Sequence, residues 1–526
     1  MSFVEWQYPL LLVVTYLLYW NLPHLYRVYL LIGASYYFYA CWDVRFLALL
    51  IATTSVDYLC GLSMKGKQLG ALKTAIPFLL PGAWLSVCSW IPDVGILPPW
   101  LAPSALGLGA AGFFAYKALW LFPDSKRKKA FLAFSLCANL LILGFFKYYG
   151  FFVGNFALLL EQFGFHASLP LLEILLPVGI SFYTFQSLSY VIDVYRGETK
   201  PCTGFHHYSA YISFFPQLVA GPIERSTTLL PQITSASTWE KEHLSIGCRL
   251  ILSGYFKKVF VADNCAVLAN YVFEPGTPLN AQWAILGVLA FAFQIYGDFS
   301  GYSDIARGSA RLFGISLQQN FKFPYFAISP SDFWRRWHVS LSSWFRDYVY
   351  IPLGGNRSGQ MRTLANLLLT MLLAGLWHGA SWNFVLWGAF HGLLLAVYHT
   401  IPAGLSLEGD SKFPLLKRLP AMGTMFLLTL VGWALFRTQD PGHFYHWLQA
   451  LGNWDPAITF SSEKPYKYLL VFVSPLLFLQ LLSLKFSDEV AFGRFHWGAR
   501  GAIYTLMIIL IASSAQTNHE FIYFQF

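Results

Sequence analysis

Long hydrophobic runs recur from the beginning to the end of this 526-residue chain. Examples are "YPLLLVVTYLLYW", "RTLANLLLTMLLAGLW" and "GAIYTLMIILIASSA", and the polar segments between such runs are short. Because a helix needs about 20 apolar residues to cross the hydrocarbon core of a bilayer, the pattern predicts about a dozen transmembrane or half-membrane helices. We therefore expect an all-α polytopic membrane protein.

Composition agrees with this pattern. Hydrophobic residues make up 56% of the chain, charged residues only 12%, and the mean hydropathy is +0.50. A soluble protein of this length could not bury so many apolar side chains. The net charge of +9 comes from basic residues scattered among loops, as in membrane proteins, so we exclude a nucleic-acid partner. The seven cysteines form no CxxC pair, and we expect them to be small buried hydrophobes.

The distribution of basic residues predicts an orientation in the membrane. Arg27, the lysines between positions 65 and 73, and "KRKK" at 126–129 each follow an apolar run. Since cytoplasmic loops are enriched in Lys and Arg, we expect these three loops in the cytoplasm and the N-terminus outside, with Arg45 as the one exception. The first run lacks the basic start of an export signal, so we interpret it as a retained span.

The segment 74–122 contains two apolar runs joined by "SWIPDVGILPPWLAPS", which is free of Lys and Arg. We expect a transmembrane hairpin whose turn, with Pro92 and Pro98, faces outward. The most polar stretch, 222–244, is predicted to be a cytoplasmic loop with short interfacial helices.

Charged residues are few in this chain, but several of them are concentrated in "WRRWHVSLSSWFRDYVYIPLGGNR", residues 334–357. If residues 332–348 form one helix, Trp337 lies on an aromatic face and Arg335 and Arg346 lie on a polar face. His338 then lies at the boundary between the two faces. Such a helix is too polar to span lipid, so we expect it to lie at the interface or to re-enter among other helices. The alternative is an ordinary surface helix with snorkelling arginines.

The same segment ends in a predicted tight turn. Gly354, Gly355 and Asn356 are typical turn residues. Their backbone N–H groups and the side chain of Arg357 would then be free to meet an anion.

A second candidate is His378 in "AGLWHGASWNFVLWGAFHG", an otherwise uncharged run. An intramembrane histidine is hydrogen-bonded or lines a wet cavity, so it is either structural or functional. The small residues Gly375, Gly379, Ala380 and Gly388 predict closely packed helices around it. His391 falls on a different helical face and is expected to be structural.

Asp298 and Tyr302 lie in a third apolar segment, "FQIYGDFSGYSDIARGSARLFG". For Asp298 two interpretations stay open: the carboxylate orients a histidine, or it caps a broken helix.

Common catalytic signatures are missing. The chain contains no GxSxG, HExxH or GxxxxGK sequence. "HFYH" at 443–446 has the helical spacing of metal ligands, but without a third ligand nearby we expect an interfacial histidine pair and no metal site.

Five ordered motifs resemble the membrane-bound O-acyltransferase family, in the branch that acetylates alginate and other bacterial polysaccharides. They are "ISFYTFQSLSYVIDVYRG", "FFPQLVAGPIER", "QIYGDFSGYSDIA", "FWRRWHVSLSSWFRDYVYIPLGGNR" and "GLWHGASWNFVLWGAFHG", and the terminal "FIYFQF" is similar as well. The resemblance covers about residues 1–65 and 126–526. It implies one membrane domain over 1–526, a ring of tilted transmembrane and re-entrant helices around a funnel or tunnel, with 74–122 as an inserted hairpin.

The resemblance also implies site residues. His378 matches the family's catalytic histidine, which we expect to be the general base, and His338 matches a second histidine that polarises or positions the donor. Arg335, Arg346 and Arg357 are expected to hold the phosphates of the donor. The further substrate-binding candidates are Asn356, Trp337, Asp298, Tyr302, Gln186, Trp377 and Asn383, and no bound cofactor or metal is expected.

The implied activity is O-acetylation of an exported polysaccharide from a multi-pass position in the bacterial inner membrane. The donor would be acetyl-CoA or another cytosolic thioester, and the implied partners are a periplasmic esterase-like protein and the polysaccharide secretion machinery. Two alternatives remain: D-alanyl transfer to teichoic acid from a carrier protein, and a transporter that uses the same polar funnel without covalent chemistry. A transporter would normally show internal repeats, and none is visible in the sequence.

Overall fold

The computed structural model describes residues 2–90, 98–165, 172, 174–219, 221–401, 415–455, 465–486, 488–514 and 521–522. Within these ranges the regular secondary structure is helical and contains no β-strand. Eight helical stretches of the described residues are long and apolar enough to cross a membrane: Val44–Ser63, Ala71–Cys88, Leu101–Leu121, Asp124–Gln162, Ala281–Leu312, Arg418–Arg437, Pro465–Phe486 and Trp497–Ser514. The prediction of an all-α polytopic membrane protein is confirmed.

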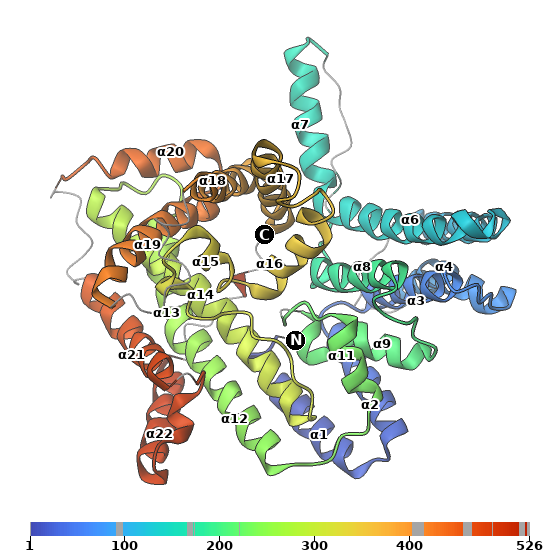
Figure 1. Ribbon diagram of the computed structural model, residues 1–526, viewed down its shortest axis with the longest axis horizontal. Coiled ribbons are helices and arrows are strands. Elements are labelled where there is room, and N and C mark those ends of the chain that lie inside the picture. The colour runs from blue at the N-terminus through green and yellow to red at the C-terminus, as the bar shows by residue number, and fades with distance from the viewer. Residues whose placement is uncertain are drawn as a thin grey trace. The chain divides into compact units, whose positions relative to one another are not determined.

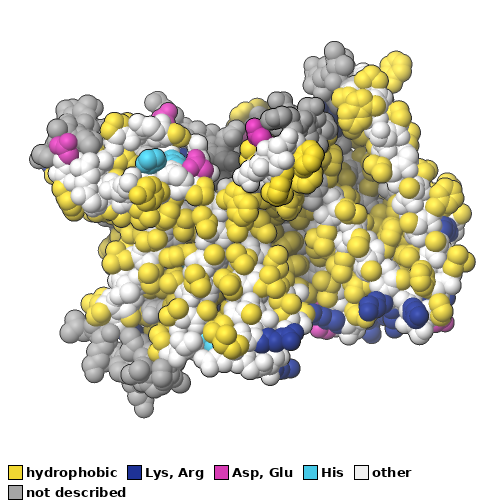
Figure 2. Space-filling model, turned by 90° about the horizontal axis from the view of Figure 1, so that it is seen from above, with side chains coloured by type: hydrophobic (Ala, Val, Ile, Leu, Met, Phe, Trp, Pro, Cys, Tyr) yellow, Lys and Arg dark blue, Asp and Glu magenta, His cyan; other side chains and the backbone are white. Residues whose placement is uncertain are grey.

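The surface of these helices is hydrophobic. Leu108 is 76% exposed and Leu470 is 62% exposed. Figure 2 shows hydrophobic side chains over most of the face that it draws, with several Lys and Arg side chains at its lower centre and lower right. So much exposed apolar surface is typical of helices that face lipid.

The chain divides into two compact units, and unit 1 comprises residues 1–245 and 309–317. Its helices are α1 (Gln7–Asn21), α2 (His24–Ala40), α3 (Leu47–Ser63), α4 (Ala71–Cys88), α5 (Leu101–Ala118), α6 (Asp124–Leu143), α7 (Tyr149–Gln162), α8 (Ile180–Arg196), α9 (Phe205–Ser213), α10 (Phe215–Leu218) and α11 (Ser226–Thr234) (Figure 1). α11 is a short helix in the polar stretch 222–244, as predicted. α1, the predicted first span, has 15 residues and is shorter than the roughly 20 of a full span.

A buried carboxylate joins three helices of unit 1. Asp57 of α3 is fully buried and accepts hydrogen bonds from Ser135 and Asn139 of α6, at 2.5 Å and 2.9 Å, and from Ser187 of α8. Buried polar groups in native proteins are normally paired in this way. These bonds therefore fix α3, α6 and α8 against one another.

α4 and α5 are the two apolar runs of the predicted hairpin. A Cβ on Gly109 would lie 1.9 Å from the carbonyl oxygen of Phe78, and one on Gly82 would lie 2.6 Å from the amide nitrogen of Leu106. Only glycine permits this approach of the two backbones. The two helices are thus confirmed, whereas Pro92, in the predicted turn, lies outside the described residues.

Unit 2 comprises residues 246–308 and 318–526. Its helices are α12 (Lys241–Tyr255), which begins in unit 1, and α13 (Asp263–Val272), α14 (Ala281–Leu312), which ends in unit 1, α15 (Pro330–Trp334), α16 (Val339–Phe345), α17 (Gln360–His378), α18 (Trp382–His399), α19 (Leu415–Arg437), α20 (Pro441–Ala450), α21 (Pro465–Phe486) and α22 (Trp497–Ser514). In Figure 1, α15, α16, α17 and α18 lie next to one another.

The α17–α18 hairpin is held by close backbone contacts. A Cβ on Gly375 would lie 2.1 Å from the carbonyl oxygen of Phe384, and one on Gly388 would lie 2.4 Å from that of Met371. The close packing predicted from small residues is confirmed at both glycines.

Glycines also let α12 approach α14. A Cβ on Gly254 would lie 2.6 Å from the carbonyl oxygen of Gly301, and one on Gly308 would lie 2.7 Å from that of Gly247. α14 runs without interruption from Ala281 to Leu312, so the helix break considered at Asp298 does not occur.

Candidate active site

The segment around His338 is not the continuous helix predicted over 332–348. α15 ends at Trp334, α16 begins at Val339, and His338 between them has a φ of 42°. A left-handed residue cannot continue a right-handed helix. The amides of Val339 and Ser340 instead donate to Asn320, to its carbonyl oxygen at 2.9 Å and to its side-chain oxygen at 3.2 Å. The prediction was wrong because helical periodicity does not detect this long-range partner.

Aromatic rings surround the imidazole of His338. The ring centroid of Phe299 lies 4.6 Å away in an edge-to-face contact, that of Trp377 lies 6.0 Å away and that of Phe321 lies 6.4 Å away. The side chain is fully buried, and this burial lowers the pKa of His338 to about 3. His338 is therefore neutral at physiological pH.

His378 is the last residue of α17, and Gly379 after it has extended backbone. Its ring contacts Trp377, Trp387 and Phe436, with centroid distances of 5.0 Å, 4.9 Å and 5.2 Å. The side chain is 4% exposed. The hairpin glycines thus place an imidazole at a helix end inside an aromatic cluster.

Trp377 connects the two histidines. Its ring packs on the imidazole of His338 and on that of His378, and it is itself buried. His391 is one ring further away, since it contacts Trp387 at 4.7 Å and Trp387 contacts His378. The two histidines singled out by sequence therefore belong to one buried cluster.

Trp337 and Asn383 contribute to packing around this cluster. Trp337 stacks on Phe333, with centroids 5.8 Å apart, and contacts Trp433 at 4.7 Å. The side-chain amide of Asn383 donates to the carbonyl oxygen of Thr438 at 2.7 Å, which ties the start of α18 to the end of α19.

The predicted turn at 354–357 is present, because Gly354 and Gly355 both have positive φ values. Three of its four amides are engaged within the turn, however. The N–H of Gly354 donates to Ile351, that of Gly355 donates to Tyr350, and that of Arg357 donates to Gly354, all at 2.9 to 3.1 Å. Of the expected backbone donors, the N–H of Asn356 is the one that the turn leaves for an anion, next to the side chain of Arg357.

The three arginine candidates and Asn356 lie on the surface. Arg335, Arg346, Asn356 and Arg357 are all exposed, and the guanidinium of Arg346 donates to Asp347 at 2.7 Å. Exposed guanidinium groups are accessible to a phosphate-bearing molecule from solution.

Asp298 has partners that neither interpretation anticipated. Its Oδ1 lies 2.9 Å from the Nζ of Lys258, and its Oδ2 accepts the backbone N–H of Ile522 at 2.7 Å. Tyr302, one turn further along α14, packs on Phe521 with centroids 4.1 Å apart. Asp298 and Tyr302 thus hold residues 521–522 near the C-terminus against α14.

Gln186 belongs to unit 1. Its side-chain nitrogen donates to the carbonyl oxygen of Tyr211 at 2.6 Å, and its side-chain oxygen accepts from Gln217 at 2.5 Å. The side chain is fully buried, and both ends of its amide are hydrogen-bonded within unit 1.

The rings that surround the two histidines could not be predicted from the sequence. Phe299 contacts His338, whereas Trp387 and Phe436 contact His378. Aromatic residues make up 18% of the chain, so their presence alone gave no signal.

The two buried imidazoles offer different chemistry, because the neutral ring of His338 can donate or accept a hydrogen bond, whereas an imidazole with an ordinary pKa can also transfer a proton. A surrounding that excludes water strengthens the electrostatic interactions of both rings. His378 is suited to accept a proton, because the C-terminal end of α17 favours the positive charge that the ring acquires.

The chain resembles known membrane-bound acyltransferases over most of its length. The profile of MBOAT, the membrane-bound O-acyltransferase family, matches residues 202–404, which include His338 and His378. The chain is 38% identical over 432 residues to the probable alginate O-acetylase AlgI of Pseudomonas putida, covering 82% of this chain and 76% of that protein. It is 34% identical over 394 residues to the peptidoglycan O-acetyltransferase of Helicobacter pylori, covering 70% of this chain and 63% of that protein.

A more distant relative is the teichoic acid D-alanyltransferase of Bacillus subtilis, which is 30% identical over 239 residues, or 42% of this chain and 58% of that protein. The extent of the similarity to the alginate protein, together with the membrane helices, establishes the class of the protein. The chain belongs to the membrane-bound O-acyltransferase family and is a multi-pass membrane O-acyltransferase.

Proposed function

We propose that the protein moves an acetyl group from a cytosolic thioester donor to hydroxyl groups of an exported polysaccharide, with a periplasmic protein as intermediate acceptor. The observation that carries the proposal is the burial of His338 and His378 against the same indole ring, that of Trp377. Similarity to proteins named for acetylation of alginate and peptidoglycan supports acetyl as the group and a bacterial glycan as the final acceptor.

His378 acts as the general base in this proposal. Its imidazole takes the proton of the acceptor hydroxyl while the hydroxyl oxygen attacks the thioester carbonyl. The carbon–sulfur bond then breaks, and the proton passes from His378 to the departing thiolate. The products are an ester and a free thiol. The negative end of the α17 dipole stabilises the intermediate imidazolium.

His338 positions the donor or polarises its carbonyl in this proposal. A neutral imidazole has one N–H donor and one acceptor nitrogen, and burial keeps His338 neutral. A hydrogen bond to the developing oxyanion is worth more in a water-excluded site than in solution.

The exposed arginines Arg335, Arg346 and Arg357 are proposed to hold the donor. Guanidinium groups bind phosphates through paired hydrogen bonds, and both coenzyme A and phosphopantetheine carriers bear phosphates. This role needs an accessible side chain, which all three have.

D-alanyl transfer to teichoic acid is the second candidate function. The D-alanyltransferase relative matches a much smaller part of the chain than the O-acetylation relatives do. This difference favours acetyl.

Purified protein incubated with acetyl-CoA labelled in the acetyl group tests the proposal. We expect label to leave the thioester and to appear as ester on an added glycan or on the partner protein. Label that stays on coenzyme A, with transfer from a D-alanyl carrier protein instead, would favour the second candidate.

A further inference from the structure

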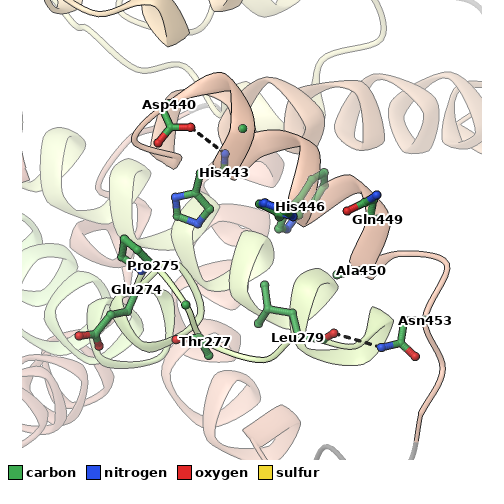
Figure 3. A pocket seen from close by; sticks show the side chains of 13 residues that line it. Glu274, Pro275, Thr277, Leu279, Asp440, His443, His446, Gln449, Ala450 and Asn453 are labelled. Carbon is green, nitrogen blue, oxygen red and sulfur yellow. Dashed lines mark hydrogen bonds between the residues drawn. The ribbon is translucent and has the colours of Figure 1, made fainter.

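A surface pocket of about 640 Å³ lies between α20 and the loop that joins α13 to α14. Figure 3 shows His443 and His446 on α20, with the side chain of His443 directed towards Pro275 of the loop. The volume is in the range of small-molecule sites, about 300 to 1,000 Å³. The polar lining residues are Glu274, Thr277, Asp440, His443, His446, Gln449 and Asn453.

Specific contacts hold the walls of this pocket. The indole N–H of Trp447 donates to the carbonyl oxygen of Ala284 at 3.2 Å, and the N–H of Ala281 donates to the carbonyl oxygen of Asn453 at 2.6 Å. Asp440 caps α20 by accepting the N–H of His443 at 2.9 Å. α20 is thus fixed to the first turn of α14, and the pocket is preformed.

Several polar side chains of the pocket are available to a ligand. Those of Glu274, His446 and Gln449 are exposed, and none of the three makes a hydrogen bond to another described residue. Together they offer N–H donors and oxygen and nitrogen acceptors within one concave surface. Such a mixed set suits a ligand that is rich in hydroxyl groups.

The charge of the lining narrows the ligand further. Glu274 and Asp440 contribute two carboxylates, and no Lys or Arg lines the pocket. A carboxylate-bearing ligand would be repelled there, whereas hydroxyl and ammonium groups would be accepted. A metal ion fits poorly, since no group of three His, Cys, Asp or Glu in the described ranges could hold one.

The pocket is at the end of unit 2 that has fewer basic residues. Arg437 and Lys467 lie at this end, in the last turn of α19 and the first turn of α21. At the other end, Arg249 and Arg307 flank the Gly247–Gly308 contact of α12 and α14, Arg307 pairs with Glu489, and Lys485 and Arg494 precede and follow that residue in the chain. From Ala281 to Arg307, α14 rises about 39 Å, enough to cross a bilayer. Since basic residues favour the cytoplasm, the pocket faces outward.

We propose that this outward pocket binds a short segment of a neutral or amine-bearing glycan, which is the acceptor polymer or its nascent end. The inference rests on the proposed function for the identity of the polymer. It also limits that polymer, because an acidic polymer such as alginate would meet Glu274 and Asp440.

Binding of defined oligosaccharides to the purified full-length protein tests this inference. The probes are tetra- to hexasaccharides of three kinds: cello-oligomers, which are neutral, chitosan oligomers, which carry amines, and alginate oligomers, which carry carboxylates. We expect calorimetry to detect a neutral or amine-bearing probe. Glu274→Ala and His446→Ala should each weaken its binding about 10-fold or more, while His399→Ala, an exposed histidine outside the pocket, should leave binding unchanged.

Preferential binding of alginate oligomers, no binding of any saccharide, or equal binding by Glu274→Ala and wild type would each overturn the inference. Zinc binding that His446→Ala abolishes, without saccharide binding, would do the same. His378→Ala separates the two proposals: saccharide binding should survive it while acetyl transfer is lost. If the wild-type protein binds a saccharide but transfers no acetyl group, the inferred glycan pocket is supported and only the proposed function is refuted.

Discussion

The imidazole of His338 meets the ring of Phe299 edge to face, with ring centroids 4.6 Å apart. Phe299 follows Asp298, whose carboxylate lies 2.9 Å from the ammonium of Lys258. Lys258 also pairs with the carboxylate of Asp263, so these three buried charged residues form an ion cluster that fixes the part of α14 that packs on His338. Substitutions in this ion cluster are expected to alter the site without contacting a substrate.

Substitution of His378 tests the proposed base. We expect His378→Ala to lower acetyl transfer by about 10² to 10⁴-fold, because general-base catalysis typically contributes that much. Expression and membrane insertion should stay near normal. Label transfer from acetyl-CoA and detergent-extracted yield are the measurements.

If His378 has only a structural role, His378→Ala should instead lower the stability of the protein. Activity would then be lost only in proportion to the loss of folded protein. His391→Ala is the matched control, because this histidine is equally buried and also contacts Trp387. We expect it to reduce folded yield more than specific activity. A stable His378→Ala protein with normal transfer would refute the base, and the transporter alternative would then be tested by substrate flux in vesicles.

Three variants separate the side chain of His338 from its backbone. Asparagine keeps a side-chain hydrogen-bond donor and tolerates a positive φ better than most residues. Alanine has no such donor and does not tolerate a positive φ well. Glycine accepts the φ of 42° but has no side chain. We expect His338→Asn to retain more activity than His338→Ala, and His338→Gly to fold well with low activity. Equal and complete loss in folded Asn and Ala variants would instead make His338 an essential acid or base.

Stability should depend on pH through His338. Burial lowers the pKa of this residue to about 3, whereas an unfolded histidine has a pKa of about 6.5. Between these values the unfolded chain binds more protons, so stability falls as the pH drops below about 6.5. Melting temperatures at about pH 7.5 and pH 5 should differ less for His338→Asn than for wild type. Identical differences in the two proteins would contradict the buried neutral state.

The ion cluster predicts a large loss of stability in Lys258→Met. The variant leaves the buried carboxylates of Asp263 and Asp298 facing each other without the lysine that bridges them, which typically costs about 3 to 5 kcal/mol. Adding Asp298→Asn should restore part of this loss. Lys485→Met, at an exposed lysine of the same unit, should have little effect on the melting temperature. A similar melting temperature for both single variants would argue against the cluster.

The topology of α4 and α5 is tested by labelling. A cysteine at Gly95, in the turn that lies outside the described residues, should react with an impermeant maleimide added to intact cells. The exposed Cys41, Cys137 and Cys248 must first be replaced. A cysteine at Ser125, beside the basic cluster, is the control that should react only after the membrane is opened. Reaction of the Gly95 position only under that condition would reverse the predicted orientation.

The sequence allowed prediction of the parts of the site that local pattern determines. Gly375 and Gly388 indicated a close helix pair, and the Gly354–Gly355 turn followed from its residue types. It could not predict the φ of His338, because that conformation depends on Asn320, which captures the amides of Val339 and Ser340.

The partners of Asp298 could not be predicted either, because they are also distant from it in the sequence. Lys258 lies forty positions earlier in the chain, in a helical segment that contains none of the motifs described above. A buried carboxylate signals that a partner exists, but only the packing of α12 on α14 through Gly254 and Gly301 identifies it.

The glycine contacts between α17 and α18 also constrain attempts to change the acyl group. Because a Cβ at Gly375 would collide with backbone rather than with a side chain, that position cannot be varied to enlarge the site without separating the two helices. Room for an acyl chain longer than acetyl must come from smaller residues at Trp387 or Phe436, the rings that face His378. A library aimed at acyl-chain selectivity should therefore vary those two positions and leave the glycines fixed.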